Sequence, residues 1–277
     1  RFGSFVAVQD VDLTVPMGQT VVLWGPNGAG KTTILRCLLG IVPYEGDVRL
    51  MGVDVRRRGK EARRAVGYVP QEIRLHLDHS VEETVWMFAR LRRIAPALAM
   101  ERLRVWGLGA AARQRVHTLS GGMKQKLALV IALLADPPIL LLDEPASSLD
   151  VRTRRDLLEA MERLASEGKT LVLCSHRRGD IWRLADRVVV LEGGRVAIDG
   201  SPQIVAERAN AHAVLSLTVP ADRLQDAAQT LTAGGFTVEH NGLQLWVLGS
   251  AARTTEPLMR LREAGIPILS FDLLEEG

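Results

Sequence analysis

A glycine-rich segment near the start of the chain has the residue types and spacing of a phosphate site. Its residues fit the pattern G-x-x-x-x-G-K-[ST] and continue into a second threonine: Gly25, Pro26, Asn27, Gly28, Ala29, Gly30, Lys31, Thr32 and Thr33. Glycines let successive backbone N–H groups surround phosphate oxygens, and Lys31 adds a positive charge. Thr32 offers a hydroxyl to Mg²⁺ at the positive end of the helix that it opens. The spacing predicts a nucleotide-phosphate site, with a chance match as the alternative.

A pair of carboxylates follows an apolar run later in the chain. Asp143 and Glu144 come directly after Ile139-Leu140-Leu141-Leu142, so a buried strand would end at both side chains. Ligands bind at this end of the strands in doubly wound sheets. Asp143 suits the coordination shell of Mg²⁺, and Glu144 could polarise an attacking water. Alone, the pair would indicate a solvated strand end; with the phosphate loop, it predicts hydrolysis of a nucleoside triphosphate.

A third short string, Leu119-Ser120-Gly121-Gly122, lies between these two. At the start of a helix, a serine hydroxyl and the N–H groups of two glycines can bind an anion. Such a triplet by itself usually marks a turn.

The elements around these strings alternate between strands and helices. Apolar runs predict strands at residues 19–24, 65–69, 139–142 and 170–174, and helical periodicity falls at 32–39, 80–111, 120–135 and 152–166. Strands that alternate with helices predict an α/β fold with a mostly parallel sheet covered on both faces.

The last part of the chain follows a different pattern. Strands are predicted at 213–219, 236–240, 243–248 and 266–273, with helices at 220–232 and 250–264, and Asn241-Gly242 is a hairpin signal. This β-α-β-β-α-β order predicts a small ferredoxin-like domain. We therefore expect a nucleotide-binding domain over 1–206 with a helical subdomain at about 72–118, a linker over 207–211, and a small α+β domain over 212–277.

Composition restricts the class of protein. The chain has 277 residues, a formal net charge of +3 and two cysteines, neither in a metal-ligand spacing. The weak basic excess forms no obvious Lys/Arg face, so no nucleic-acid partner is expected. The longest apolar stretch, residues 127–135, is far short of the ~20 residues that span a bilayer.

Together the three strings resemble the ATP-binding-cassette (ABC) family, over about residues 2–205. The resemblance implies a P-loop cassette in which two copies close head to tail around ATP and Mg²⁺. Ser120, Gly121 and Gly122 of one copy would cap the γ-phosphate held by the other. It also implies that Asp150, in Ser147-Ser148-Leu149-Asp150, lies in the loop that crosses between cassettes.

Three further positions acquire roles from the same resemblance. Phe2 would stack on adenine, with Phe5 as an adjacent candidate; a lone aromatic is otherwise packing. Gln71 would sense Mg²⁺ and water and couple to a membrane subunit. His176 would contact the γ-phosphate, although a single histidine is more often structural. The sequence departs from the family pattern at four positions, none of which removes a catalytic group: Trp24, Met123, Ala146 and Ser148.

The resemblance implies an ATPase subunit that drives separate transmembrane permease subunits, as a homodimer or with a second cassette, at the cytoplasmic face of the membrane. An exporter is the leading interpretation, because the small last domain resembles the extension of cassettes from drug and antibiotic efflux systems. One alternative is an importer ATPase whose last domain binds a small effector. The other is a non-transport cassette that acts on ribosomes or DNA.

Overall fold

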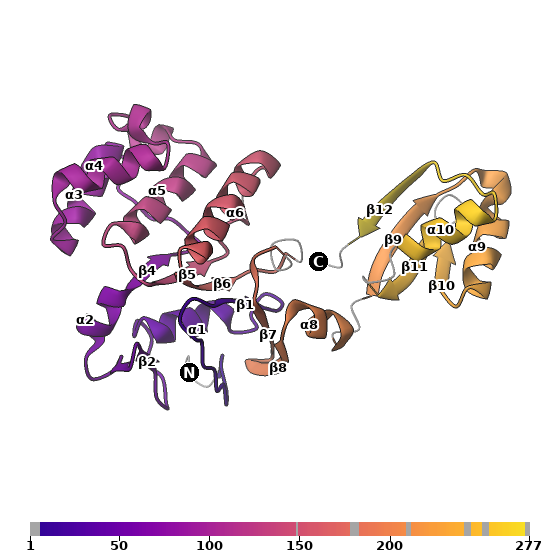
Figure 1. Cartoon of the computed structure of the whole chain (residues 1–277), viewed down its shortest axis with the longest axis horizontal. Helices are drawn as coiled ribbons and strands as arrows, with labels where there is room; N and C mark the ends of the chain where they lie inside the picture. Colours follow the sequence, from indigo (N-terminus) through magenta and orange to yellow (C-terminus); the bar gives the residue numbers. More distant parts are fainter. Residues whose placement is uncertain are drawn as a thin grey trace. The chain divides into compact units, whose positions relative to one another are not determined.

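The structure is a computed structural model that describes residues 6–147, 149–177, 183–208, 212–240, 245–250 and 255–274. The chain divides into two compact units, Arg1–Pro202 and Gln203–Gly277 (Figure 1). Each is described by itself.

A six-stranded sheet organises the first unit, in the order β4-β5-β6-β1-β7-β8. The strands are β1 (Thr20–Trp24), β4 (Val66–Val69), β5 (Ile139–Asp143), β6 (Thr170–Cys174), β7 (Arg187–Glu192) and β8 (Arg195–Gly200). The four pairs from β4 to β7 are parallel, and β8 joins β7 antiparallel. All five residues of β5 and of β6 are buried. Continuous apolar runs form strands here because both faces of a parallel sheet are covered.

Helices of the first unit enclose two separate apolar clusters. They are α1 (Lys31–Leu38), α2 (Gly59–Ala62), α3 (Val81–Arg92), α4 (Pro96–Val105), α5 (Gly121–Leu133) and α6 (Val151–Ser166), and a small hairpin pairs β2 (Arg49–Leu50) with β3 (Val53–Asp54). One cluster joins Leu35 of α1 to the sheet residues Leu23 and Leu141. The other joins α3, α4 and α5 through Val85, Leu103 and Leu127. The second cluster is the core of a helical region beside the sheet.

The second unit is an antiparallel sheet with two main helices. After α8 (Pro202–Arg208), its elements are β9 (His212–Thr218), α9 (Leu224–Ala233), β10 (Thr237–His240), β11 (Leu245–Ser250), α10 (Thr255–Glu263) and β12 (Ser270–Leu274). The strand order is β10-β11-β9-β12, and every neighbouring pair is antiparallel. Leu231 of α9 and Leu261 of α10 are buried in one core with Leu217 of β9, so both helices pack on the same sheet.

Most predicted strands and helices are confirmed, with instructive exceptions. The sequence analysis did not predict β2, β3, α2, β7, β8 or α8. The helical stretch expected over 80–111 is two helices, because α3 ends before Arg93, which lies in the left-handed region, and Pro96 begins α4. Ser250, expected to begin a helix, ends β11. Residues 266–269, expected as strand, precede β12, and 220–223 hold a short 3₁₀ turn before α9. The Asn241-Gly242 turn lies outside the described residues. The boundary at 206/207 stays a prediction; α8 covers the first two residues of the expected linker, and 209–211 are not described.

Within the described ranges, we found no helix both long and apolar enough to cross a membrane.

Candidate active site

Four neighbouring parallel strands bring the predicted site residues to one edge of the sheet. In the order β4-β5-β6-β1, these strands end just before Gln71, at Asp143 and Glu144, just before His176, and at the phosphate loop. Val69 pairs with Leu142, and Asp143 pairs with Cys174, so the strand ends lie level. Because parallel strands share their carboxyl ends, segments far apart in the sequence form a single site.

The phosphate loop owes its path to three glycines in the left-handed region. Gly25, Gly28 and Gly30 have φ values of 151°, 84° and 101°. A Cβ on Gly25 would lie 2.3 Å from the Leu191 carbonyl oxygen, and one on Gly30 would lie 2.7 Å from that of Ala7. A Cβ on Gly28 would meet no described residue within 4 Å, so its backbone angle is the reason for glycine that the structure shows. The loop is therefore held tightly against its surroundings at both ends.

Helix α1 leaves the loop with its amino end available to an anion. No side chain caps the helix at Gly30, and no acidic residue lies in its first turn. Lys31 is 6% exposed, and its Nζ donates hydrogen bonds to the carbonyl oxygens of Gly25 and Pro26. A buried ammonium beside unpaired helix N–H groups gives the loop a concentrated positive potential.

Thr32 and Asp143 meet at the base of this loop. The Thr32 hydroxyl donates to Asp143 Oδ1 over 2.9 Å, and Asp143 is 1% exposed. The neighbouring Cys174 thiol has its pKa raised, first by burial and then by the charge of Asp143. Two hard oxygen donors at this spacing beside a phosphate loop fit Mg²⁺, which binds proteins through one or two oxygens plus substrate phosphates.

Glu144 occupies an unusual backbone position at the end of β5. Its φ of 48° lies in the left-handed region, which costs a non-glycine residue free energy and is concentrated at functional sites. The Ser147 hydroxyl donates to the Glu144 carbonyl oxygen over 3.0 Å, and the Glu144 N–H donates to the Cys174 carbonyl. These bonds hold the turn that follows β5.

The Glu144 carboxylate has one paired and one unpaired oxygen. Oε2 lies 2.9 Å from His176 Nδ1, and Oε1 is buried with no hydrogen-bond partner among the residues described. The Glu144 side chain is 8% exposed, whereas the His176 side chain is 48% exposed. A buried oxygen without a partner is costly unless something completes it. A substrate water would do so, which is the arrangement that a general base requires.

The comparisons with known proteins agree with this geometry. Residues 8–147 match the family model described as ABC transporter. A Nod factor export ATP-binding protein I of Burkholderia lata is 40% identical over 212 residues, which cover 75% of this chain and 70% of that protein. The chain belongs to the ABC transporter family. Another protein of that name, from Cupriavidus metallidurans, is 36% identical over 250 residues, covering 88% of this chain and 82% of its own.

Solved ABC structures share the fold. An ATP-binding subunit of an ABC transporter aligns with a TM-score of 0.66 and 29% identity, covering 73% of this chain and 86% of its own. The cassette MJ0796, solved as a dimer in a post-hydrolysis state with ADP and Pi, aligns with a TM-score of 0.64 and 27% identity, covering 71% and 90%. This ABC protein is the ATP-binding and ATP-hydrolysing subunit of a transporter.

The remaining predicted residues lie at this edge beyond β4, at the starts of α5 and α6, or outside the description. Ser120 caps α5 by accepting from the Met123 N–H over 3.2 Å, and Asp150 caps α6. Gln71 is exposed just beyond β4. In the described ranges, the side-chain hydrogen bonds of Ser120 and Asp150 run to their own helices and not to the phosphate loop. Phe2, Phe5 and Ser148 lie outside the described residues.

Sequence reasoning missed two residues that support the site. Ser147 holds the turn at Glu144, and Thr153 contacts both Gly122 and Asp150. A hydroxyl three residues after Glu144 is a typical turn signal that could have identified Ser147. No local pattern could have identified Thr153, because its contact with Gly122 joins two separate helices.

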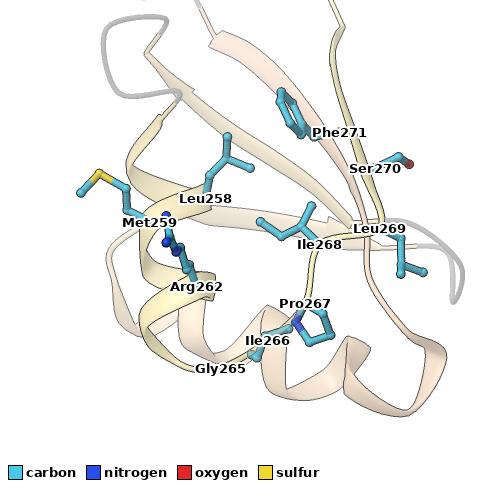
Figure 2. A pocket seen from close by; sticks show the side chains of 10 residues that line it. All are labelled: Leu258, Met259, Arg262, Gly265, Ile266, Pro267, Ile268, Leu269, Ser270 and Phe271. Carbon is cyan, nitrogen blue, oxygen red and sulfur yellow. The ribbon is translucent and has the colours of Figure 1, made fainter.

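The second unit has a hollow of its own, of about 900 Å³, between α10 and the segment that leads into β12 (Figure 2). Its lining is mainly apolar, and Met259, Leu269 and Phe271 are each more than half exposed. Arg262 also lines it, and in the described part of the chain its side chain has no ion-pair or hydrogen-bond partner. The hollow combines an apolar surface with one available positive charge.

Proposed function

We propose that this ABC ATPase drives export through separate transmembrane permease subunits at the cytoplasmic face of the membrane. The observation that supports the ATPase assignment is the unpaired, buried carboxylate oxygen of Glu144 beside a phosphate loop. Export is supported by the relatives, whose names describe export ATP-binding proteins. Nod factor is the substrate named for those relatives. The substrate exported with this chain would be selected by its permease.

The mechanism assigns one task to each group. The loop N–H groups and Lys31 would bind the β- and γ-phosphates of ATP, and Thr32 with Asp143 would hold Mg²⁺, which neutralises phosphate charge. Glu144 would accept a proton from the attacking water, and His176 would orient Glu144 and contact the γ-phosphate. Gln71, just beyond the end of β4, would sense Mg²⁺ and water and couple the site to the membrane subunit.

The site would be completed by a second cassette, either another copy or a related subunit. Ser120, Gly121 and Gly122 open α5 with N–H groups that suit an anion, and Asp150 begins α6 nearby. These residues would serve the triphosphate held by the opposite cassette, with Phe2 stacking on adenine. Dimeric relatives of the same fold support this arrangement.

The decisive experiment replaces Glu144 with Gln, which keeps the side-chain shape and removes the base. Turnover of the full chain should fall by about 10²–10⁴-fold, while nucleotide affinity stays within a factor of about two and a dimer accumulates with Mg-ATP. Glu167→Gln, at an exposed helix end, is the matched control. Normal hydrolysis by E144Q would refute the role of Glu144.

Direction of transport needs a separate test. When the chain is combined with the permease encoded beside it, ATP should drive substrate into inside-out membrane vesicles. A requirement for an external binding protein would instead indicate import.

We further propose that the second unit is a ferredoxin-like domain, supported by its element order and the strand order β10-β11-β9-β12. The hollow in Figure 2 supports binding of a small effector by this domain, specifically one with an apolar body and an anionic group, whichever the direction of transport. Decanoate should then bind the full chain more tightly than decanol does, and Arg262→Gln should remove the difference. Arg260→Gln is the control, since Arg260 pairs with Glu256. Equal binding of both probes would refute this proposal.

A further inference from the structure

Helices α5 and α6 approach each other unusually closely at Gly122. A Cβ placed on Gly122 would lie 2.3 Å from Cγ2 of Thr153, far inside normal contact distance. Among the residues described, none lies within 4 Å of the same position on its neighbour Gly121. The first turn of α5 therefore rests on the methyl group of Thr153, and the two glycines of the triplet differ in what they require.

The other branch of Thr153 binds Asp150. Its hydroxyl donates to Asp150 Oδ2 over 2.7 Å, and its backbone N–H donates to Oδ1 over 3.0 Å. Both carboxylate oxygens are thus occupied by one residue. These two bonds also lower the pKa of Asp150, the backbone bond being the larger cause.

We propose that Thr153 is a positioning residue that links the Ser120-Gly121-Gly122 triplet to Asp150. A threonine side chain is stiff about χ1, so its methyl and hydroxyl groups cannot move independently. The methyl group fixes Thr153 against α5 while the hydroxyl fixes the carboxylate. Further along the same pair of helices, Lys126 lies 3.9 Å from Asp156, which supports the same register.

The consequence is that one side chain sets the distance between two segments expected to serve the ATP bound by the opposite cassette. This inference rests on the proposed head-to-tail dimer. Thr153 touches neither nucleotide nor Mg²⁺ in that arrangement. Its loss should therefore weaken closure of the dimer without weakening nucleotide binding to the chain's own phosphate loop.

Thr153→Val separates the two contacts, because valine keeps the methyl group on Gly122 and loses the hydroxyl. In an E144Q background, the ATP-dependent dimer should dissociate about tenfold more readily, as expected when a hydrogen bond to a charged group is lost. Binding of a fluorescent ADP analogue should be unchanged. Thr153→Ser keeps the hydroxyl but loses the methyl group that lies against Gly122, so it should weaken the dimer as well. Sedimentation velocity with Mg-ATP measures all three variants.

Two controls make the outcome specific. Ser166→Ala removes a hydroxyl from the other end of α6, where it bonds the Arg163 carbonyl, and should change nothing. In an Asp150→Ala background, Thr153→Val should cause no further loss. If E144Q alone stays monomeric, the proposed dimer fails; if E144Q dimerises and T153V dimerises equally well, the role of Thr153 is refuted.

Discussion

Replacing Gly122 with alanine tests the close contact between α5 and α6 directly. The new methyl carbon would lie 2.3 Å from Thr153 Cγ2, whereas carbon atoms normally approach to about 3.5–4.0 Å. Overpacking of this kind costs about 1–3 kcal/mol. Alanine regains at most about 1 kcal/mol over glycine in a helix, and less in the first turn. We expect a net destabilisation of about 1–2 kcal/mol, measured by urea and thermal unfolding of the full chain. In a unit of this size, each kcal/mol lowers Tm by about 2–4 °C.

A second substitution identifies the cause. Thr153→Ser removes Cγ2, and the nearest remaining Thr153 atoms, Oγ1 and Cβ, would lie 3.2 and 3.3 Å from the new methyl. Gly122→Ala should therefore be nearly neutral in a T153S background, so that the double-mutant cycle shows a coupling of about 1–2 kcal/mol. Gly121→Ala is the matched control and should not destabilise. If Gly122→Ala costs nothing, or costs the same with serine at 153, the steric explanation is wrong.

Three other substitutions test the site and its support. Lys31→Ala removes the buried ammonium and should abolish binding of a fluorescent ATP analogue. His176→Ala should lower kcat at least about tenfold with little change in nucleotide affinity, because it orients the base; an unchanged kcat would contradict this role. Lys169 donates a hydrogen bond to Asp136 and so lowers the pKa of that carboxyl. A lowered carboxyl pKa stabilises the fold above the unfolded value of about 3.9 and ceases to do so as the pH falls through the folded value. Lys169→Met should therefore cost under about 1 kcal/mol more at pH 7 than in strong acid, as measured by urea unfolding against pH. The loss of the Lys169 bond to the Pro137 carbonyl is common to both conditions.

The sequence predicts the chemistry of the site well because local patterns determine it. A glycine-rich loop between a strand and a helix can be recognised from neighbouring residues alone. The same is true of acidic residues at the end of an apolar run. The level alignment of strand ends then follows from a parallel sheet. Thr32 and Asp143 are far apart in the sequence yet meet within hydrogen-bond distance.

Features that depend on distant contacts could not be predicted. The left-handed backbone of Glu144 is held partly by its N–H bond to the Cys174 carbonyl on the neighbouring strand, which a residue pattern does not encode. Strand β7 is an apolar run that was overlooked, whereas β8 alternates between exposed and half-buried residues and gives a weak signal. Glycine is required at position 122 because Thr153, on another helix, lies too close for a larger side chain.

Residues 71, 143, 144 and 176 take their spacing from neighbouring strands, which repeat at about 4.8 Å across any sheet. The spacing between strands is constant and does not depend on the length of the chain that connects them. The long excursion between β4 and β5 carries its own apolar cluster. It can accordingly gain or lose turns while the distances among the residues at the strand ends stay constant.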